Sequence, residues 1–140
     1  MRKSKYIPIT IILVCIVFWI GSVIRIEFQT WRYISEFSIP DSVPDGVVAM
    51  TGIGNLKVLS YSSESVQIYN FGRYGGTLYR YVRQNSEWQF ESWGTIWAEL
   101  GSADDFVWPY IYHSSEGKGL LLLLGIPVLL IAFISLCSKR

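Results

Sequence analysis

Two uncharged stretches decide the fold: YIPITIILVCIVFWIGSVI at residues 6–24 and GLLLLLGIPVLLIAFISLC at residues 119–137. Each stretch contains 19 residues. At about 1.5 Å per residue, a helix of this length reaches roughly 28 Å, close to the ~30 Å hydrocarbon thickness of a bilayer. The two stretches therefore predict two transmembrane helices, and Pro127 in the middle of the second predicts a kink.

The composition agrees with a membrane protein. Hydrophobic residues make up 51% of the chain and charged residues 16%, against roughly 25% charge in a typical soluble domain. A chain this rich in aromatic side chains and this poor in charge is not intrinsically disordered. All eleven acidic residues lie between Glu27 and Glu116, so the charge of both chain ends is purely basic.

Basic residues at the two ends of the chain predict its orientation. Five of them flank the spans on the side of the termini, namely Arg2, Lys3, Lys5, Lys139 and Arg140. Arg25 and Lys118 flank the spans on the other side. Because cytoplasmic loops carry an excess of Lys and Arg, we expect the tails 1–5 and 138–140 to be cytoplasmic. The segment 25–118 then lies outside the cytoplasm, and the chain is a multi-pass protein of the cell membrane.

A cleaved signal peptide is the alternative interpretation of the N-terminus. Its apolar core is usually 7–15 residues long and is followed by a small-residue cleavage site. The stretch 6–24 is longer, and no such site follows it. Cys15 does not fit a lipoprotein cysteine either, because Val14 stands where a small residue is expected. We therefore favour an uncleaved anchor.

The two cysteines and the asparagines point to a bacterial cell surface. Cys15 is expected in the middle of the bilayer and Cys137 at its cytoplasmic edge, so the two should not form a disulfide. The outer segment contains no cysteine and no N-glycosylation sequon, since Asn55, Asn70 and Asn85 all lack the required pattern. Both absences favour a bacterial surface over a eukaryotic lumen.

Small residues in both spans are compatible with close helix packing. They are Gly21 and Ser22 in the first span and Gly125 and Ala132 in the second. Such residues let membrane helices approach closely. The sequence leaves open whether this packing occurs within one chain or between chains, and the oligomeric state is equally open.

The outer segment begins as a helix and continues as a β-meander. We expect residues 25–37 to extend the first helix until Pro40, followed by a turn at 43–46. Five short runs rich in β-branched and aromatic residues then predict antiparallel strands: Val47–Thr51, Leu56–Tyr61, Val66–Phe71, Thr77–Arg83 and Trp88–Trp93. A helical turn is expected over Thr95–Leu100, and a last edge strand, confined there by Pro109, over Phe106–His113.

One hairpin of the meander can be phased from its turn. If Asn85-Ser86 is a two-residue loop, the facing pairs are Arg83 with Trp88, Tyr81 with Phe90 and Arg80 with Glu91. Tyr79, Tyr81, Trp88 and Phe90 then form one face, the predicted core. Leu78, Arg80, Val82, Glu91 and Trp93 form the other face. That face is amphipathic, so the 95–113 segment, the membrane surface or a partner is expected to cover it.

The sequence offers little catalytic chemistry. His113 is the single histidine, and its place after an aromatic run favours a structural role over a catalytic one. One His without an outer Cys cannot fill a zinc shell, so we expect no metal and no cofactor. Glu87 and Glu91 share a strand face about 13 Å apart, which is too far for a glycosidase pair at ~5–9.5 Å. The segment 26–118 has six basic and eleven acidic residues, which disfavours nucleic-acid binding.

The remaining signal is the density of aromatic residues in the outer segment. Eighteen residues between 26 and 118 are Phe, Trp or Tyr. In one interpretation they only fill the core of a small domain without disulfides. In the other, exposed rings such as Trp97 and Trp108, with nearby acids, form a binding face. The candidate binding residues are Trp93, Trp97, Asp104, Asp105, Trp108 and Tyr110.

Together these observations predict an α+β membrane protein in which two transmembrane helices flank a small extracytoplasmic antiparallel β-meander domain. The leading functional hypothesis is a non-enzymatic protein that rests in the lipid bilayer and binds a membrane or envelope protein partner in an accessory, regulatory or immunity-type role. The first alternative is a cell-wall or glycan-binding module. The weaker alternative is an envelope hydrolase that uses Asp104 or Glu99 with His113.

Overall fold

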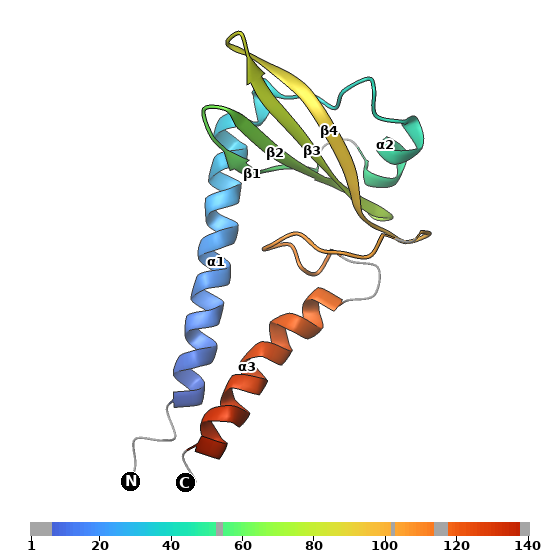
Figure 1. Ribbon diagram of the computed structural model, residues 1–140. Helices are drawn as coiled ribbons and strands as arrows, with labels where there is room; N and C mark the ends of the chain where they lie inside the picture. Colours follow the sequence, from blue (N-terminus) through green and yellow to red (C-terminus); the bar gives the residue numbers. More distant parts are fainter. Residues whose placement is uncertain (1–6, 53–54, 102, 114–117, 138–140) are drawn as a thin grey trace.

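A long N-terminal helix carries a small β-sheet at one end (Figure 1). The computed structural model describes residues 7–52, 55–101, 103–113 and 118–137. Helix α1 runs from Ile7 to Tyr33 and continues as the 3-10 turn η2, Ile34–Glu36, which confirms the predicted extension of the first helix through the 25–37 region. The tails 1–5 and 138–140, on which the predicted orientation rests, lie outside the described residues.

One helix within the described residues is long and apolar enough to cross a membrane. It lies within Ile9–Glu36, and only 6% of its most apolar window is buried inside the protein. Its length and composition fit a membrane span or a signal sequence equally. Helix α3 runs from Lys118 to Cys137, but its apolar part within the described residues, Gly125–Ser135, is shorter than a span requires. Within the described residues, the second predicted transmembrane helix is therefore not supported.

The sheet is an antiparallel meander in which each strand pairs with the next along the chain. Its strands are β1 (Leu56–Tyr61), β2 (Ser65–Phe71), β3 (Gly75–Gln84) and β4 (Glu87–Ala98). Four of the five predicted strands of the meander are thus confirmed, and the last of them is longer than expected. The α+β class follows directly from this arrangement.

The first predicted strand is wrong: residues 47–51 belong to helix α2, Asp45–Thr51. Val47 and Val48 suit a strand, but the flanking residues decide otherwise. Pro44 holds φ at −58° just before the helix, and the acidic Asp45 lies in its first turn, where negative charge is favourable. Gly52 ends the helix with a φ of 76°. The expected turn at 43–46 lies three residues earlier, at 40–43, where Val43 N–H donates to the carbonyl of Pro40.

Both expectations for the chain after residue 94 are also wrong. Thr95–Ala98 do not form a helical turn, because they continue β4 and pair with the start of β3 at Gly75–Thr77. Residues 103–113, which we call the strap, do not form an edge strand either. The strap makes one isolated bridge, between Asp104 and Trp97, and then leaves the sheet edge through two turns. Pro109 has no N–H to donate to a β-ladder, consistent with this irregular path.

The hairpin between β3 and β4 confirms the predicted two-residue loop. Asn85 and Ser86 have φ values of 50° and 70°, as a type I′ turn requires. The pairs Arg83 with Trp88 and Tyr81 with Phe90 form as expected. The register then shifts between Arg80 and Tyr81, so that Arg80 pairs with Ser92 and Glu91 is the extra residue of a β-bulge.

This bulge corrects the predicted faces of β4. The charge pair still forms, with Arg80 Nε 2.7 Å from Glu91 Oε2, because the bulged carboxylate can reach across. Trp93, however, pairs with Tyr79 and therefore lies on the core face rather than on the opposite one. A single extra residue has reversed the side on which this indole lies.

Each face of the sheet buries its own apolar cluster. The first includes Val43, Val58, Val66, Ile68, Tyr79 and Tyr81, with Trp88 and Phe90 packed against it, as the phased hairpin predicts. The second consists of Ile26, Tyr69 and Tyr110, with flanking apolar residues that include Val107 of the strap. The strap thus covers the second face, which was one of the three covers expected for it.

Helix α1 closes the outer edge of the sheet at β1. An edge strand presents unpaired backbone groups, and covering it with a helix is one way to satisfy them. The backbone N–H of Val58, a residue with no exposed surface, donates to Thr30 Oγ1 at 2.9 Å. Tyr33 stacks on Tyr61 of β1 with ring centroids 3.8 Å apart. The outer part of α1 is therefore a structural element of the sheet domain as well as a continuation of the apolar helix.

Replacing Thr30 by valine tests this edge closure. Thr30→Val keeps the shape of the side chain but leaves the Val58 N–H without an acceptor, which costs about 1–3 kcal/mol. Thr30→Ser keeps the hydroxyl and should retain most of the stability. The free energy of unfolding of the detergent-solubilised full chain, measured by chemical denaturation, compares the two variants. Equal losses in both would show that the hydroxyl does not cap the strand.

Candidate binding surface

The second face of the sheet holds a cluster of rings beneath the strap. His113 lies against Phe71 with ring centroids 4.0 Å apart, and it stacks on Tyr110 at 5.8 Å. Tyr110 is only 2% exposed. Tyr69, from the middle of β2, stacks on Tyr110 at 6.2 Å. The aromatic density seen in the sequence is therefore largely a means of attaching the strap to the sheet.

Glu27 of α1 ties three elements together at the border of this cluster. Its Oε2 lies 2.6 Å from Lys57 Nζ of β1, and its Oε1 accepts a hydrogen bond from the Tyr110 hydroxyl at 2.9 Å. Burial raises the pKa of Tyr110, and the bond to the Glu27 carboxylate raises it further. The phenol therefore stays protonated and remains a donor at any physiological pH.

The strap is also attached to the apolar part of α1. Trp19 Nε1 donates to the carbonyl of Pro109 at 2.9 Å, and the rings of Phe18 and Trp108 lie 5.9 Å apart. The strap thus runs between the sheet on one side and the apolar helix on the other. In Figure 1 it occupies the space between the sheet and α3.

The structure buries two of the six candidate binding residues. Tyr110 is buried as described above, and Trp97 is 6% exposed. Trp97 Nε1 donates to the Tyr69 hydroxyl at 2.8 Å, and burial raises the pKa of Tyr69 to about 12. Gly76 makes room for this pair, because a Cβ there would collide with both side chains. The expectation that Trp97 is an exposed ring is therefore wrong.

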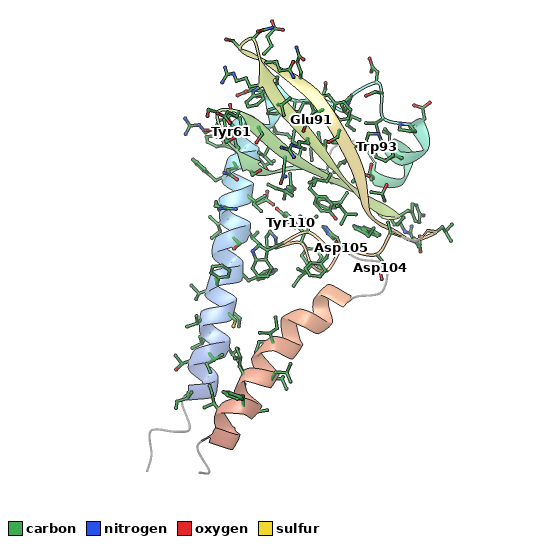
Figure 2. All side chains as sticks on the ribbon, in the orientation of Figure 1. Tyr61, Glu91, Trp93, Asp104, Asp105 and Tyr110 are labelled. Carbon is green, nitrogen blue, oxygen red and sulfur yellow. The ribbon has the colours of Figure 1, made fainter. Side chains whose placement is uncertain are left out.

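The other four candidates do not share one face. Trp93 and Trp108 are exposed, but Trp93 lies on β4 (Figure 2), on the face of Tyr79. Trp108 lies on the strap beside Phe18. Asp105 is exposed, and its Oδ1 accepts from the N–H of Phe106 at 2.7 Å. Asp104 is half-buried and forms an isolated antiparallel β-bridge with Trp97. The structure brings Trp97, Asp104 and Asp105 to one end of the sheet. The exposed indoles of Trp93 and Trp108 do not belong to this group and lie apart from each other.

A different exposed surface lies on the outer face of α1. Ile24, Phe28 and Trp31, which we call the juxtamembrane stripe, are 62%, 55% and 78% exposed. The rings of Phe28 and Trp31 lie 5.9 Å apart. The stripe points away from the buried face formed by Ile26 and Thr30. The sequence carried the signal as apolar residues at i, i+4 and i+7, but the same spacing equally predicts a stripe buried against the sheet.

His113 is poorly placed for hydrolytic chemistry. Burial lowers its pKa to about 4, and its Nδ1 is buried without a hydrogen-bond partner in the described part of the chain. A base with so low a pKa is a weak proton acceptor at neutral pH. Over the same residues, no group of three or more His, Cys, Asp or Glu side chains could hold a metal ion.

Comparison with protein-family models, with curated proteins and with solved structures gave no match for this chain.

The buried His113 predicts a pH dependence of stability. The unfolded chain takes up the imidazole proton near pH 6.5, whereas the folded chain resists it until about pH 4. The free energy of unfolding therefore falls as the pH drops from 6.5 to 4, and this group contributes no further loss below that range. The ring is only half-buried, so we expect a loss of about 1–2 kcal/mol, less than the full shift implies.

His113→Phe keeps the ring stacking and removes the titration. Thermal unfolding of the detergent-solubilised full chain, followed by tryptophan fluorescence between pH 4 and 7.5, should show a shallower pH dependence in the variant. Parallel pH profiles for the two proteins would mean that His113 is not held neutral by the fold.

Proposed function

We propose that this chain is a non-enzymatic two-pass protein of a bacterial cell membrane, with residues 25–118 outside and both tails in the cytoplasm. Its outer β domain binds a membrane protein partner at the membrane surface through the juxtamembrane stripe. The observation that carries the proposal is the exposed apolar side of α1, which continues past the charged residues Arg25 and Glu27 to Trp31.

The packing of α1 supports an uncleaved membrane anchor. A core helix of a soluble protein is mostly buried, but the apolar window of α1 is 6% buried. A signal sequence is removed from the mature protein, whereas the continuous helix α1 attaches the strap through Trp19 and the sheet edge through Thr30. Removing residues 6–24 would break the first of these contacts. The fold therefore favours retention of the helix.

The position of α3 supports the second span, which the uncharged stretch 119–137 predicts. The last turn of α3 and the first turn of α1 lie at the same end of the molecule, away from the sheet (Figure 1). A two-pass chain with both tails on one side of the membrane requires this arrangement.

The height of Trp31 favours a protein partner over lipid alone. If the hydrocarbon core ends at Ile24, Phe28 lies about 6 Å and Trp31 about 10 Å beyond it along the helix. The headgroup layer is only about 5–7 Å thick on each side. Lipid headgroups can therefore cover Phe28, but the indole of Trp31 stands at or above their outer limit. An exposed tryptophan beside another ring is typical of a binding hot spot.

The two alternatives have weaker support. A glycan platform needs several exposed rings on one side, and Trp93 and Trp108 lie on different sides of the domain. A hydrolase needs an accessible base, and His113 is packed among rings. The juxtamembrane stripe is therefore a better supported binding site than either alternative.

Photocrosslinking in intact membranes tests the proposal. A photoreactive amino acid replacing Trp31 should form a specific adduct with one membrane protein. A separate variant with the same photoreactive amino acid at Leu100, which is 93% exposed, serves as the matched control. Phe28→Ala should lower the Trp31 adduct severalfold without changing the melting temperature, because the ring is exposed. Adducts with lipid only, or the same adducts from Leu100, would contradict partner binding by the stripe.

A further inference from the structure

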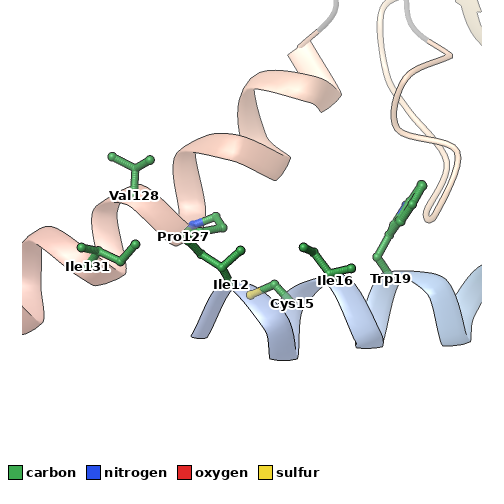
Figure 3. A pocket seen from close by; sticks show the side chains of 7 residues that line it. All are labelled: Ile12, Cys15, Ile16, Trp19, Pro127, Val128 and Ile131. Atoms are coloured by element: carbon green, nitrogen blue, oxygen red, sulfur yellow. The ribbon is translucent and has the colours of Figure 1, made fainter. Parts of the chain in front are cut away.

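An apolar groove lies between α1 and α3, on the side of α1 opposite the juxtamembrane stripe. Its lower chamber has a volume of about 220 Å³ and is lined by Ile12, Cys15 and Ile16 of α1 and by Pro127 and Ile131 of α3. Figure 3 shows these α1 side chains, with Trp19 to their right, along the side of α1 that faces α3.

An upper chamber of about 210 Å³ continues the groove toward the sheet. Phe106, Trp108 and Ile111 of the strap form its roof. Cys15 and Pro127 line both chambers, so the two chambers are adjacent parts of the groove between the helices. The groove is therefore bounded by the two helices and closed by the strap at the end nearest the outer domain.

The lining has the chemistry of a hydrocarbon site. It contains no charged side chain. Two indoles, Trp19 and Trp108, contribute to it, and Trp19 Nε1 is already bonded to the carbonyl of Pro109. Apolar side chains that face an empty space lose dispersion contacts, because no partner atoms lie on that side. Inside a bilayer, the material that surrounds such a groove is the acyl chains of the lipids.

The shape of the groove favours a flexible chain over another helix. Membrane helices pack against each other through small residues that let their backbones approach. The groove is instead lined by bulky and branched side chains, and the glycines of the two helices are elsewhere: a Cβ added at Gly21 or Gly125 would meet nothing within 4 Å.

We propose that this groove binds one acyl chain of a bilayer phospholipid, which packs against α1, α3 and the strap at the same time. This inference rests on the proposed membrane location of the chain. The bound acyl chain would connect the bilayer to the outer domain, because the strap that roofs the groove also carries Tyr110, the partner of Glu27.

The test uses the full chain reconstituted in phosphatidylcholine vesicles that carry a diazirine on one acyl chain. After illumination, peptide mass spectrometry should find adducts at Cys15, Ile16 and Pro127 severalfold above those at Val14 and Val17. Val14 and Val17 are 62% and 68% exposed and do not line the groove. They report ordinary lipid contact on the outer side of the same helix.

Filling the groove should abolish the preferential labelling of the groove residues over the outer side of α1. Cys15→Phe adds a ring at a residue that lines both chambers and should reduce the groove adducts severalfold. Val17→Phe, a matched change on the outer side, should leave them unchanged. Val128→Phe fills the lower chamber from α3. If the tryptophan fluorescence of Cys15→Phe shows that the strap has moved, Val128→Phe replaces it as the test of whether filling the groove lowers the groove adducts.

The failures of the two proposals are distinguishable. Release of the chain from membranes by alkaline carbonate contradicts both the membrane location and the groove. If the chain is retained in the membrane, three results contradict the acyl-chain site alone. The adducts are spread evenly around α1, or the groove adducts do not respond to Cys15→Phe and Val128→Phe. In the third, α1 is crosslinked to a second chain through the groove residues.

Discussion

Glu27 lies where α1, β1 and the strap meet, and each of its carboxylate oxygens contacts a different one of the other two elements. Above it on the helix, Thr30 accepts the N–H of Val58, and below it Trp19 bonds to the strap. These contacts all lie on one face of α1. Because that face closes the sheet edge and attaches the strap that covers the second apolar cluster, the sheet domain depends on the helix beneath it.

The opposite face of α1 has no such partner within the described chain. The same helix therefore carries two surfaces with separate roles: an inner face that completes the fold and lines the apolar groove, and an outer face that ends in the exposed Trp31. This division gives the sheet domain, whose sequence contains no cysteine, a cover for its edge strand. It also places the proposed partner surface and the proposed acyl-chain groove on opposite sides, so that both can be occupied together.

Local patterns in the sequence predicted the helix extension, the four strands of the meander and the hairpin turn, because each depends on neighbouring residues. Three features depended on longer-range contacts and were missed. The bulge at Glu91 moved Trp93 to the other face, and the pairing of Thr95–Ala98 with β3 overrode the expected helical turn. The burial of Trp97 depends on Gly76 across the sheet, which a residue pattern along β4 does not reveal. The juxtamembrane stripe was visible as a spacing, but only the tertiary structure shows which side of α1 the sheet covers.

Amide hydrogen exchange of the full chain in lipid vesicles tests the central claim most directly. If the inner face of α1 completes the sheet, the amides of residues 26–33 and 56–61 should be protected to the same degree. They should also lose protection together when Glu27→Gln weakens the junction, since they then belong to one cooperative unit. Rapid exchange over 26–33 while β1 to β4 stay protected would contradict the account, because the sheet would then fold without the helix.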